Sequence, residues 1–218
     1  MASRPPDKTT AARPTARLYL VTPPLADVAA TTALLAPALA AADIAAVLLR
    51  LPAADERTLI NRIREIAPLV QERGAALLVE GRPDLVARAG ADGAHLAGIA
   101  AMQEAIAALK PDRIVGAGGL ESRHDAMIAA ESGADYVMFG EPDSAGKRPS
   151  FPAIRERVEW WTEVFEIPCV AHAASLAEVG ELAAAEFVAL DPAILSDPRG
   201  PAQAVAEASR RLATESPA

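Results

Sequence analysis

Eight short apolar runs alternate with longer amphipathic stretches along this chain of 218 residues. Each run has the length of a β-strand, and several are continuously apolar, which is typical of parallel strands covered on both faces. The runs predicted to be strands are RLYLVT (17–22), IAAVLLR (44–50), AALLVE (75–80), GAHLAG (93–98), RIVGAG (113–118), YVMFG (136–140), PCVAH (168–172) and FVALD (187–191).

The stretches between these runs are predicted to be helices. Within residues 54–73, the apolar side chains Leu59, Ile63, Ile66 and Val70 recur with a period near 3.6, which favours a helix with one buried face. The other predicted helices cover residues 25–42, 84–89, 100–109, 122–131, 151–165, 176–184 and 202–212. Strand and helix alternate eight times, which indicates the α/β class and predicts a single-domain (β/α)8 TIM barrel. An open doubly wound sheet is the alternative, although it usually has fewer strands.

The two ends of the chain differ in composition from the segment between them. Residues 1–15 hold three prolines and no apolar period, so we expect a flexible N-terminal tail. Residues 214–218 are similar and are predicted to form a short C-terminal tail. The barrel is therefore expected to occupy residues 16–213.

The charge and cysteine content exclude several classes of protein. With 29 acidic and 21 basic residues the net charge is −8, which argues against a chain that mainly binds nucleic acid or an anionic membrane. A single cysteine, Cys169, excludes an internal disulfide and a multi-cysteine metal site. The sequence contains neither an apolar run of about 20 residues that would span a bilayer nor the apolar segment of a secretory signal. We expect a cytoplasmic protein whose partner is a small molecule, with the Trp160–Trp161 helix as a candidate homodimer surface.

Barrel geometry restricts the search for a functional site, because ligands of such barrels bind at the carboxyl ends of the strands. Four predicted strand ends carry charge: Arg50, Glu80, Glu141 and Asp191. A charged group at a narrow barrel mouth is either paired with its neighbours or faces a polar ligand. Both interpretations stay open on the sequence alone.

One predicted loop at this end is long, polar and basic. It covers residues 141–150 and includes Lys147 and Arg148, so it either closes over an anion or is simply solvated. If the chain is an enzyme, we predict that Glu80, Glu141 or His172 moves protons and that Arg50 and Lys147 hold an anion. Gly118 and Asp191 end predicted strands at the same side of the barrel, Gly119 follows one, and these three complete the predicted substrate-binding residues.

His95 and the cysteine are predicted to be structural, and His124 is expected on the surface in the first turn of a helix. His95 lies within a predicted strand, and alternation counted from Gly98 directs its side chain toward the helix layer. Cys169 lies in an apolar strand and is expected to be a packed thiol. Two similar segments, AGADG (89–93) and SGADY (132–136), form a weak internal repeat that we assign to a repeated helix–turn–strand unit.

Several segments resemble the family of thiamine phosphate synthase and its relative, the thiazole tautomerase. These segments are RLYLVT (17–22), LLVEGRPDLVARAGADGAHL (77–96), GADYVMFG (133–140) and IPCVA (167–171), and Lys147 falls where the family has a lysine. The resemblance covers residues 17–212. It implies a TIM barrel and a reaction that joins a hydroxymethylpyrimidine diphosphate to a thiazole phosphate, with magnesium and release of pyrophosphate.

The chain departs from this family pattern at the predicted mouth. Glu80-Gly81 stand in place of an Asn-Asp pair and Gly98-Ile99-Ala100 in place of Gln-x-Asp, so both carboxylates that the resemblance assigns to magnesium are missing. Ala173-Ala174 replace paired glycines, and the family's phosphate-binding serine falls near Pro192, which has no N–H. These losses predict weakened phosphate sites and no metal ligands.

We therefore expect a diverged barrel that binds a small heteroaromatic or anionic metabolite at its mouth. If it is an enzyme, metal-free proton transfer, as in an isomerase or tautomerase, fits these residues better than magnesium-dependent diphosphate chemistry. Two alternatives stay open. One is an active thiamine phosphate synthase that uses magnesium, and the other is a non-catalytic barrel that binds a metabolite or a partner protein.

Overall fold

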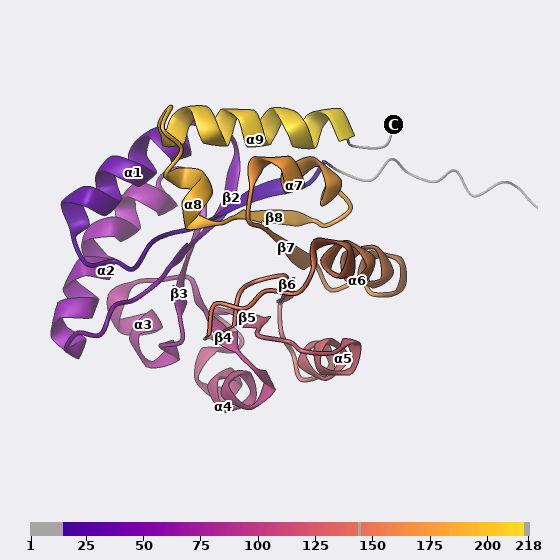
Figure 1. Ribbon diagram of the computed structural model, residues 1–218. Helices are drawn as coiled ribbons and strands as arrows, with labels where there is room; N and C mark the ends of the chain where they lie inside the picture. The colour runs from indigo at the N-terminus through magenta and orange to yellow at the C-terminus, as the bar shows by residue number, and fades with distance from the viewer. Residues whose placement is uncertain (1–14, 144, 216–218) are drawn as a thin grey trace, which may run out of the picture.

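Eight parallel strands close into a barrel in the order of the sequence (Figure 1). The computed structural model describes residues 15–143 and 145–215. The barrel closes where β1 pairs with β8, with Leu20 opposite Leu190. The strands are β1 (Arg17–Val21), β2 (Ile44–Leu49), β3 (Ala76–Glu80), β4 (Gly93–Ala97), β5 (Ile114–Gly118), β6 (Tyr136–Phe139), β7 (Cys169–Ala173) and β8 (Phe187–Leu190). The predicted (β/α)8 TIM barrel is confirmed.

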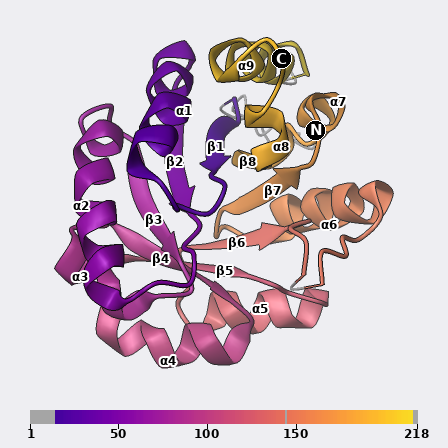
Figure 2. The same ribbon diagram turned by 60° about the vertical axis from the view of Figure 1, so that its left-hand side comes forward.

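The helices surround the strands on the outside of the barrel (Figure 2). They are α1 (Val28–Ala41), α2 (Glu56–Gln71), α3 (Val86–Ala89), α4 (Ile99–Leu109), α5 (Arg123–Glu131), α6 (Phe151–Val164), α7 (Leu176–Glu181), α8 (Pro192–Leu195) and α9 (Pro201–Glu215), with a 3₁₀ turn, η1 (Pro83–Leu85), before α3. The sequence did not predict α8, because a four-residue helix is too short to show an apolar period. Its start is fixed by Asp191, whose side chain accepts the Ala193 N–H at 2.8 Å.

Short polar side chains set where several elements begin. Helix α5 starts with a capping box, in which Ser122 and Asp125 each accept the other's backbone N–H. The aspartates of the internal repeat have a structural role at the strands. The Asp92 carboxylate accepts the Leu77 N–H of β3 and the Asp135 carboxylate accepts the Val115 N–H of β5, each at 2.7 Å. The repeat is thus part of the barrel framework.

The apolar residues form two separate cores. The larger lies between strands and helices, is mostly aliphatic, and includes the fully buried Trp161 of α6 stacked on Phe165 with ring centroids 4.1 Å apart. The smaller cluster contains only strand residues, so it fills the interior of the barrel. Its members are Tyr19, Val21, Ala46, Leu48, Leu78, Tyr136, Met138, Val170 and Ala189. Two tyrosines therefore lie inside a barrel that aliphatic side chains usually fill.

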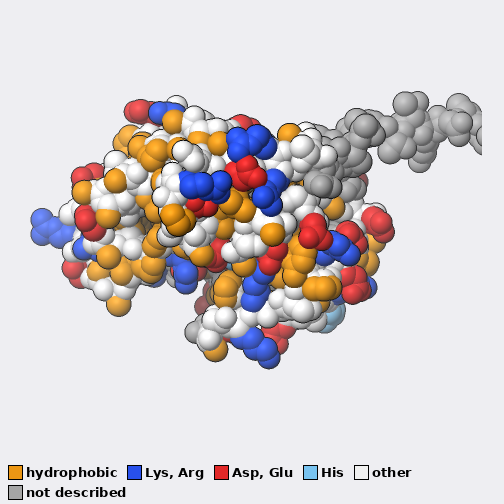
Figure 3. All heavy atoms as spheres, turned by 45° about the horizontal axis from the view of Figure 1, so that its top comes forward, with side chains coloured by type: hydrophobic (Ala, Val, Ile, Leu, Met, Phe, Trp, Pro, Cys, Tyr) orange, Lys and Arg blue, Asp and Glu red, His pale blue; other side chains and the backbone are white. Residues whose placement is uncertain are grey.

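The predicted tails and the predicted homodimer surface concern the ends of the chain and the outside of the barrel. Helix α9 extends through Glu215, while residues 1–14 and 216–218 lie outside the described residues, so the two flexible tails stay predictions. Trp160 is half-buried, with the Arg123 guanidinium 4.6 Å from its ring centroid, and the homodimer also stays a prediction. On the face seen in Figure 3, acidic and basic side chains are interspersed. None of the described helices is long and apolar enough to cross a membrane.

Candidate functional site

A cavity of about 510 Å³ opens at the carboxyl ends of the strands. A second cavity of about 490 Å³ adjoins it, and the two share Met138, Glu141, Pro142 and Asp143. Five predicted site residues line the larger cavity: Arg50, Glu80, Glu141, His172 and Asp191. Gly119 and Lys147 line the smaller one. The mouth of the barrel thus brings together most of the side chains that strand-end geometry selected.

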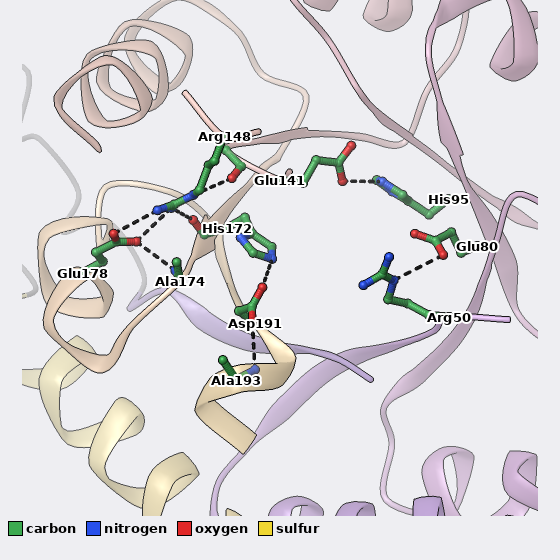
Figure 4. A network of polar contacts seen from close by, with 11 residues as sticks. Arg50, Glu80, His95, Glu141, Arg148, His172, Ala174, Glu178, Asp191 and Ala193 are labelled. Atoms are coloured by element: carbon green, nitrogen blue, oxygen red, sulfur yellow. Dashed lines mark hydrogen bonds and ion pairs between the residues drawn. The ribbon is translucent and has the colours of Figure 1, made fainter. Parts of the chain in front are cut away.

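Glu141 lies between the two cavities and is held by two donors. Its Oε2 atom is 3.0 Å from His95 Nε2 (Figure 4). Its Oε1 atom accepts the Gly119 N–H. Burial alone would raise the pKa of Glu141, but the His95 imidazole and the Gly119 N–H outweigh burial, so its pKa lies below the usual range. Glu141 is therefore an ionised carboxylate, 19% exposed, that faces both cavities.

His95 does not face the helix layer, which corrects the sequence-based prediction. Its ring is buried, lines the larger cavity, and stacks against Tyr136 with ring centroids 5.7 Å apart. The prediction counted alternation from Gly98, but β4 ends at Ala97 and Gly98 has a φ of +87° outside the strand. Counted from Ala97, which lines the same cavity, His95 falls on the interior face.

Gly118 and Gly119, both predicted site residues, contact the Glu141–His95 pair. A Cβ atom at Gly118 would lie 2.1 Å from Glu141 Oε1 and 2.3 Å from His95 Nε2, so only glycine leaves room for both side chains. The Gly119 N–H already donates to Glu141. In this structure both glycines contribute to holding Glu141, and their contact with a substrate remains a prediction.

Arg50 and Glu80 form a loose pair next to His95, because the adjacent strands β3 and β4 place Glu80 opposite His95 (Figure 4). Arg50 Nε lies 3.4 Å from Glu80 Oε2, and the two side chains are 44% and 41% exposed. An exposed pair at this distance is worth little free energy. The guanidinium can therefore leave Glu80 for an anionic group of a ligand.

His172 is buried beside Asp191, with Nε2 3.4 Å from Asp191 Oδ2. Its Nδ1 atom is buried and has no hydrogen-bond partner among the described residues. Burial lowers the pKa of His172, and Arg148 lowers it further, against the opposing charge of Asp191. The imidazole is therefore neutral at neutral pH and can accept a proton.

Sequence reasoning missed the role of Arg148, which joins two loops at the mouth. Its guanidinium donates to both carboxylate oxygens of Glu178 at 2.9 and 2.8 Å, and to the carbonyls of Gly140 and His172. Glu178 also accepts the Ala174 N–H at 2.8 Å. Arg148 is thus committed to holding the segment after β6 against the segment after β7, whereas Lys147 beside it is exposed. Only the basic character of the 141–150 loop pointed to this position.

The family resemblance implies magnesium, which prefers several oxygen ligands. Across residues 15–143 and 145–215, no three His, Cys, Asp or Glu side chains are grouped so that they could hold a metal ion. At the mouth, Glu141 is bonded to His95 and Gly119, and Glu80 pairs with Arg50. The residues present do not form a magnesium site, so we assign no step to a metal.

Comparison with known proteins places this barrel in a family. Residues 18–190 match the family model described as thiamine monophosphate synthase, so the chain belongs to that family. It is 42% identical over 199 residues to the thiamine-phosphate synthase of Rhodospirillum centenum, covering 89% of this chain and 96% of that protein. It is 38% identical over 207 residues to the thiamine-phosphate synthase of Hyphomonas neptunium, covering 88% and 92%.

A solved structure agrees with this placement at the level of the fold. Thiamine phosphate pyrophosphorylase from Pyrococcus furiosus superposes with a TM-score of 0.75 and 21% identity, covering 92% of this chain and 97% of that one. Together with the sequence relatives, this barrel confirms the resemblance drawn from the strand motifs. The relatives favour the synthase alternative over the diverged barrel that the mouth residues led us to expect.

Proposed function

We propose that this chain is a thiamine-phosphate synthase that joins a hydroxymethylpyrimidine diphosphate to a thiazole phosphate at the barrel mouth. The observation that carries the proposal is the 42% identity to a protein of that name over 96% of that protein's length. The adjoining cavities of about 510 and 490 Å³ support it, because two heterocyclic substrates must meet there.

The reaction requires a leaving anion and an attacking nitrogen. The bond between the pyrimidine methylene carbon and the diphosphate oxygen breaks, and its electron pair leaves with pyrophosphate. The lone pair of the thiazole nitrogen forms the new carbon–nitrogen bond, and that nitrogen becomes cationic. In this site Arg50, which Glu80 holds only weakly, would bind the diphosphate, and the exposed Lys147 would neutralise a phosphate in the smaller cavity.

Product formation tests this proposal. Purified protein is mixed with the pyrimidine diphosphate and the thiazole phosphate, with and without magnesium, and thiamine phosphate and pyrophosphate are measured together. We expect equal amounts of both products, with turnover reduced in Arg50→Gln and unchanged in Arg57→Gln, an exposed arginine on α2. A cooperatively folded sample that forms neither product in either buffer would contradict the proposal.

A second candidate function is metal-free proton transfer on a small heteroaromatic ligand, as in an isomerase. The observation that favours it is the buried His172, which has an unpartnered Nδ1 atom and lies beside Asp191 in the same cavity. Proton transfer to and from an atom of the ligand's ring would exchange that ring hydrogen with solvent. Incorporation of deuterium from heavy water into the thiazole phosphate alone, lost in His172→Gln, would support this candidate, and its absence would reject it.

A further inference from the structure

A chain of hydrogen bonds runs from the barrel interior to the mouth. The Tyr19 and Tyr136 hydroxyls are 3.1 Å apart, and the Tyr136 hydroxyl is 2.9 Å from His95 Nδ1. His95 Nε2 in turn is 3.0 Å from Glu141 Oε2. Three strands and the segment after β6 supply the four groups, and all except Glu141 are buried. We name these four residues the mouth relay.

The donors and acceptors of the mouth relay define where its protons lie. An ionised carboxylate only accepts, so His95 Nε2 must carry the hydrogen that reaches Glu141. Burial raises the pKa of both Tyr19 and Tyr136, so each hydroxyl keeps its proton. In the arrangement with ring hydrogen on Nε2 alone, Tyr136 donates to Nδ1 and Tyr19 donates to Tyr136. Every bond in the relay then has one donor and one acceptor.

The interior of the barrel is shaped to hold this relay. Buried polar side chains cost free energy unless they are fully hydrogen-bonded, and aliphatic side chains are the usual filling. Strand β5 places Gly116 and Gly118 on the interior face. A Cβ at Gly116 would lie 2.1 Å from the Tyr136 ring, and one at Gly118 would meet both Glu141 and His95. Two positions without side chains thus provide the space that the relay occupies.

We propose that the mouth relay fixes the Glu141 carboxylate as a binding group for an N–H donor or a positive charge on the ligand's heteroaromatic ring, with His95 as its positioning residue. The assignment of a ligand to Glu141 rests on the proposed function, in which the thiazole nitrogen becomes cationic when the product forms. The side chains that line the larger cavity include more acidic than basic groups, which suits an N–H donor or a cationic ring. The other charged or titratable side chains that line it are Arg50, Glu80, Asp143, His172 and Asp191.

The relay itself is tested in the ligand-free protein. Long-range proton–nitrogen NMR spectra of the labelled chain at pH 7 report which ring nitrogen of each histidine carries hydrogen, and loss of signals in His95→Gln identifies His95. We expect hydrogen on Nε2 and a hydrogen-bonded, unprotonated Nδ1 whose shift moves in Tyr136→Phe, while the signals of the exposed His124 stay in place. Hydrogen on Nδ1, or no movement in Tyr136→Phe, would overturn the relay.

The role of Glu141 is tested with two probes, thiamine phosphate and inorganic pyrophosphate. Glu141→Gln is expected to weaken thiamine phosphate binding at least tenfold and to leave pyrophosphate binding unchanged. Glu104→Gln, an exposed glutamate on α4, should change neither affinity. Equal affinity of wild type and Glu141→Gln for thiamine phosphate would overturn the assignment. If the wild type binds neither probe, the proposed function fails, and so does the assignment of Glu141 as a ligand-binding group. The NMR result still decides whether the hydrogen bonds of the mouth relay are present.

Discussion

His95 and Glu141 meet across the barrel mouth with His95 Nε2 3.0 Å from Glu141 Oε2. One residue comes from β4 and the other from the segment after β6, so the pair spans the end of the intervening strand β5. Contact over that strand is possible because β5 ends in glycine. The pair therefore depends on the smallest side chain of its neighbour.

Replacing Gly118 with alanine is expected to destabilise the protein by about 1–3 kcal/mol, as over-packing does in other interiors. The new Cβ would lie 2.1 Å from Glu141 Oε1, and that oxygen is already fixed by the Gly119 N–H. Urea denaturation measures the loss. In a double-mutant cycle with Glu141→Ala, the two changes should couple by more than about 0.5 kcal/mol. Additive effects would show that the clash is absent.

Arg148 is expected to contribute more to stability than a similar arginine on the surface. The Arg148–Glu178 pair is 17% and 18% exposed and bidentate, so Arg148→Lys should lower the free energy of unfolding by about 1–3 kcal/mol. Arg155 of α6 pairs with Glu181 of α7 but is about half exposed, so Arg155→Lys should cost less than about 1 kcal/mol. Equal losses in the two variants would contradict this difference.

The pH dependence of stability should carry a contribution from His172. Its pKa is lowered in the folded state, so between the folded and unfolded pKa values the unfolded chain binds the extra proton. The contribution of His172 to the free energy of unfolding is fully present above the unfolded pKa of about 6.5. It is lost as the pH falls below that value. Glu141 and Glu178 also have lowered pKa values, but they act below their unfolded pKa of about 4.3.

Denaturation curves at pH 7.5 and pH 5.5 test this contribution. The wild type should lose more free energy of unfolding between these pH values than His172→Gln does. His124→Gln, which changes an exposed histidine, should follow the wild type. A wild type and a His172→Gln variant that lose the same amount would show that His172 is free to protonate in the folded protein.

Arg50 is expected to affect ligand binding rather than folding. Its pair with Glu80 is long and exposed, so Arg50→Gln should change the free energy of unfolding by less than about 1 kcal/mol. The same variant should raise KM for the pyrimidine diphosphate at least tenfold, because it removes a cation from the larger cavity. Steady-state kinetics measure this effect, and an unchanged KM would place the diphosphate elsewhere.

The fold could be predicted from the sequence because its signal is repeated eight times. Each predicted strand overlaps an observed one. All except β7 differ from their predictions by a single residue at one end, and β7 is shifted by one residue. The strand ends then selected Arg50, Glu80, Glu141, His172 and Asp191, which line one cavity. Parallel strands in a closed barrel place their carboxyl ends together, so order along the chain was enough for this part of the site.

The partners of these residues could not be predicted in the same way. The contact of His95 with Glu141 joins positions 46 residues apart, and that of Arg148 with Glu178 joins positions 30 apart. Which side chains meet depends on rotamers and on the space that neighbouring strands leave. For His95 the available signal was the pair of glycines at 116 and 118, whose spacing marks one face of β5 as open.

The most direct test of the central claim is a thermal melt of the protein with the pyrimidine diphosphate at about 100 times its dissociation constant. Binding to the folded state alone then adds about 2.7 kcal/mol to its stability. The account predicts a higher Tm for the wild type and Arg57→Gln and, at the same ligand concentration, a smaller rise for Arg50→Gln. No rise in the wild type, or the same rise in Arg50→Gln, would contradict a diphosphate site at the barrel mouth.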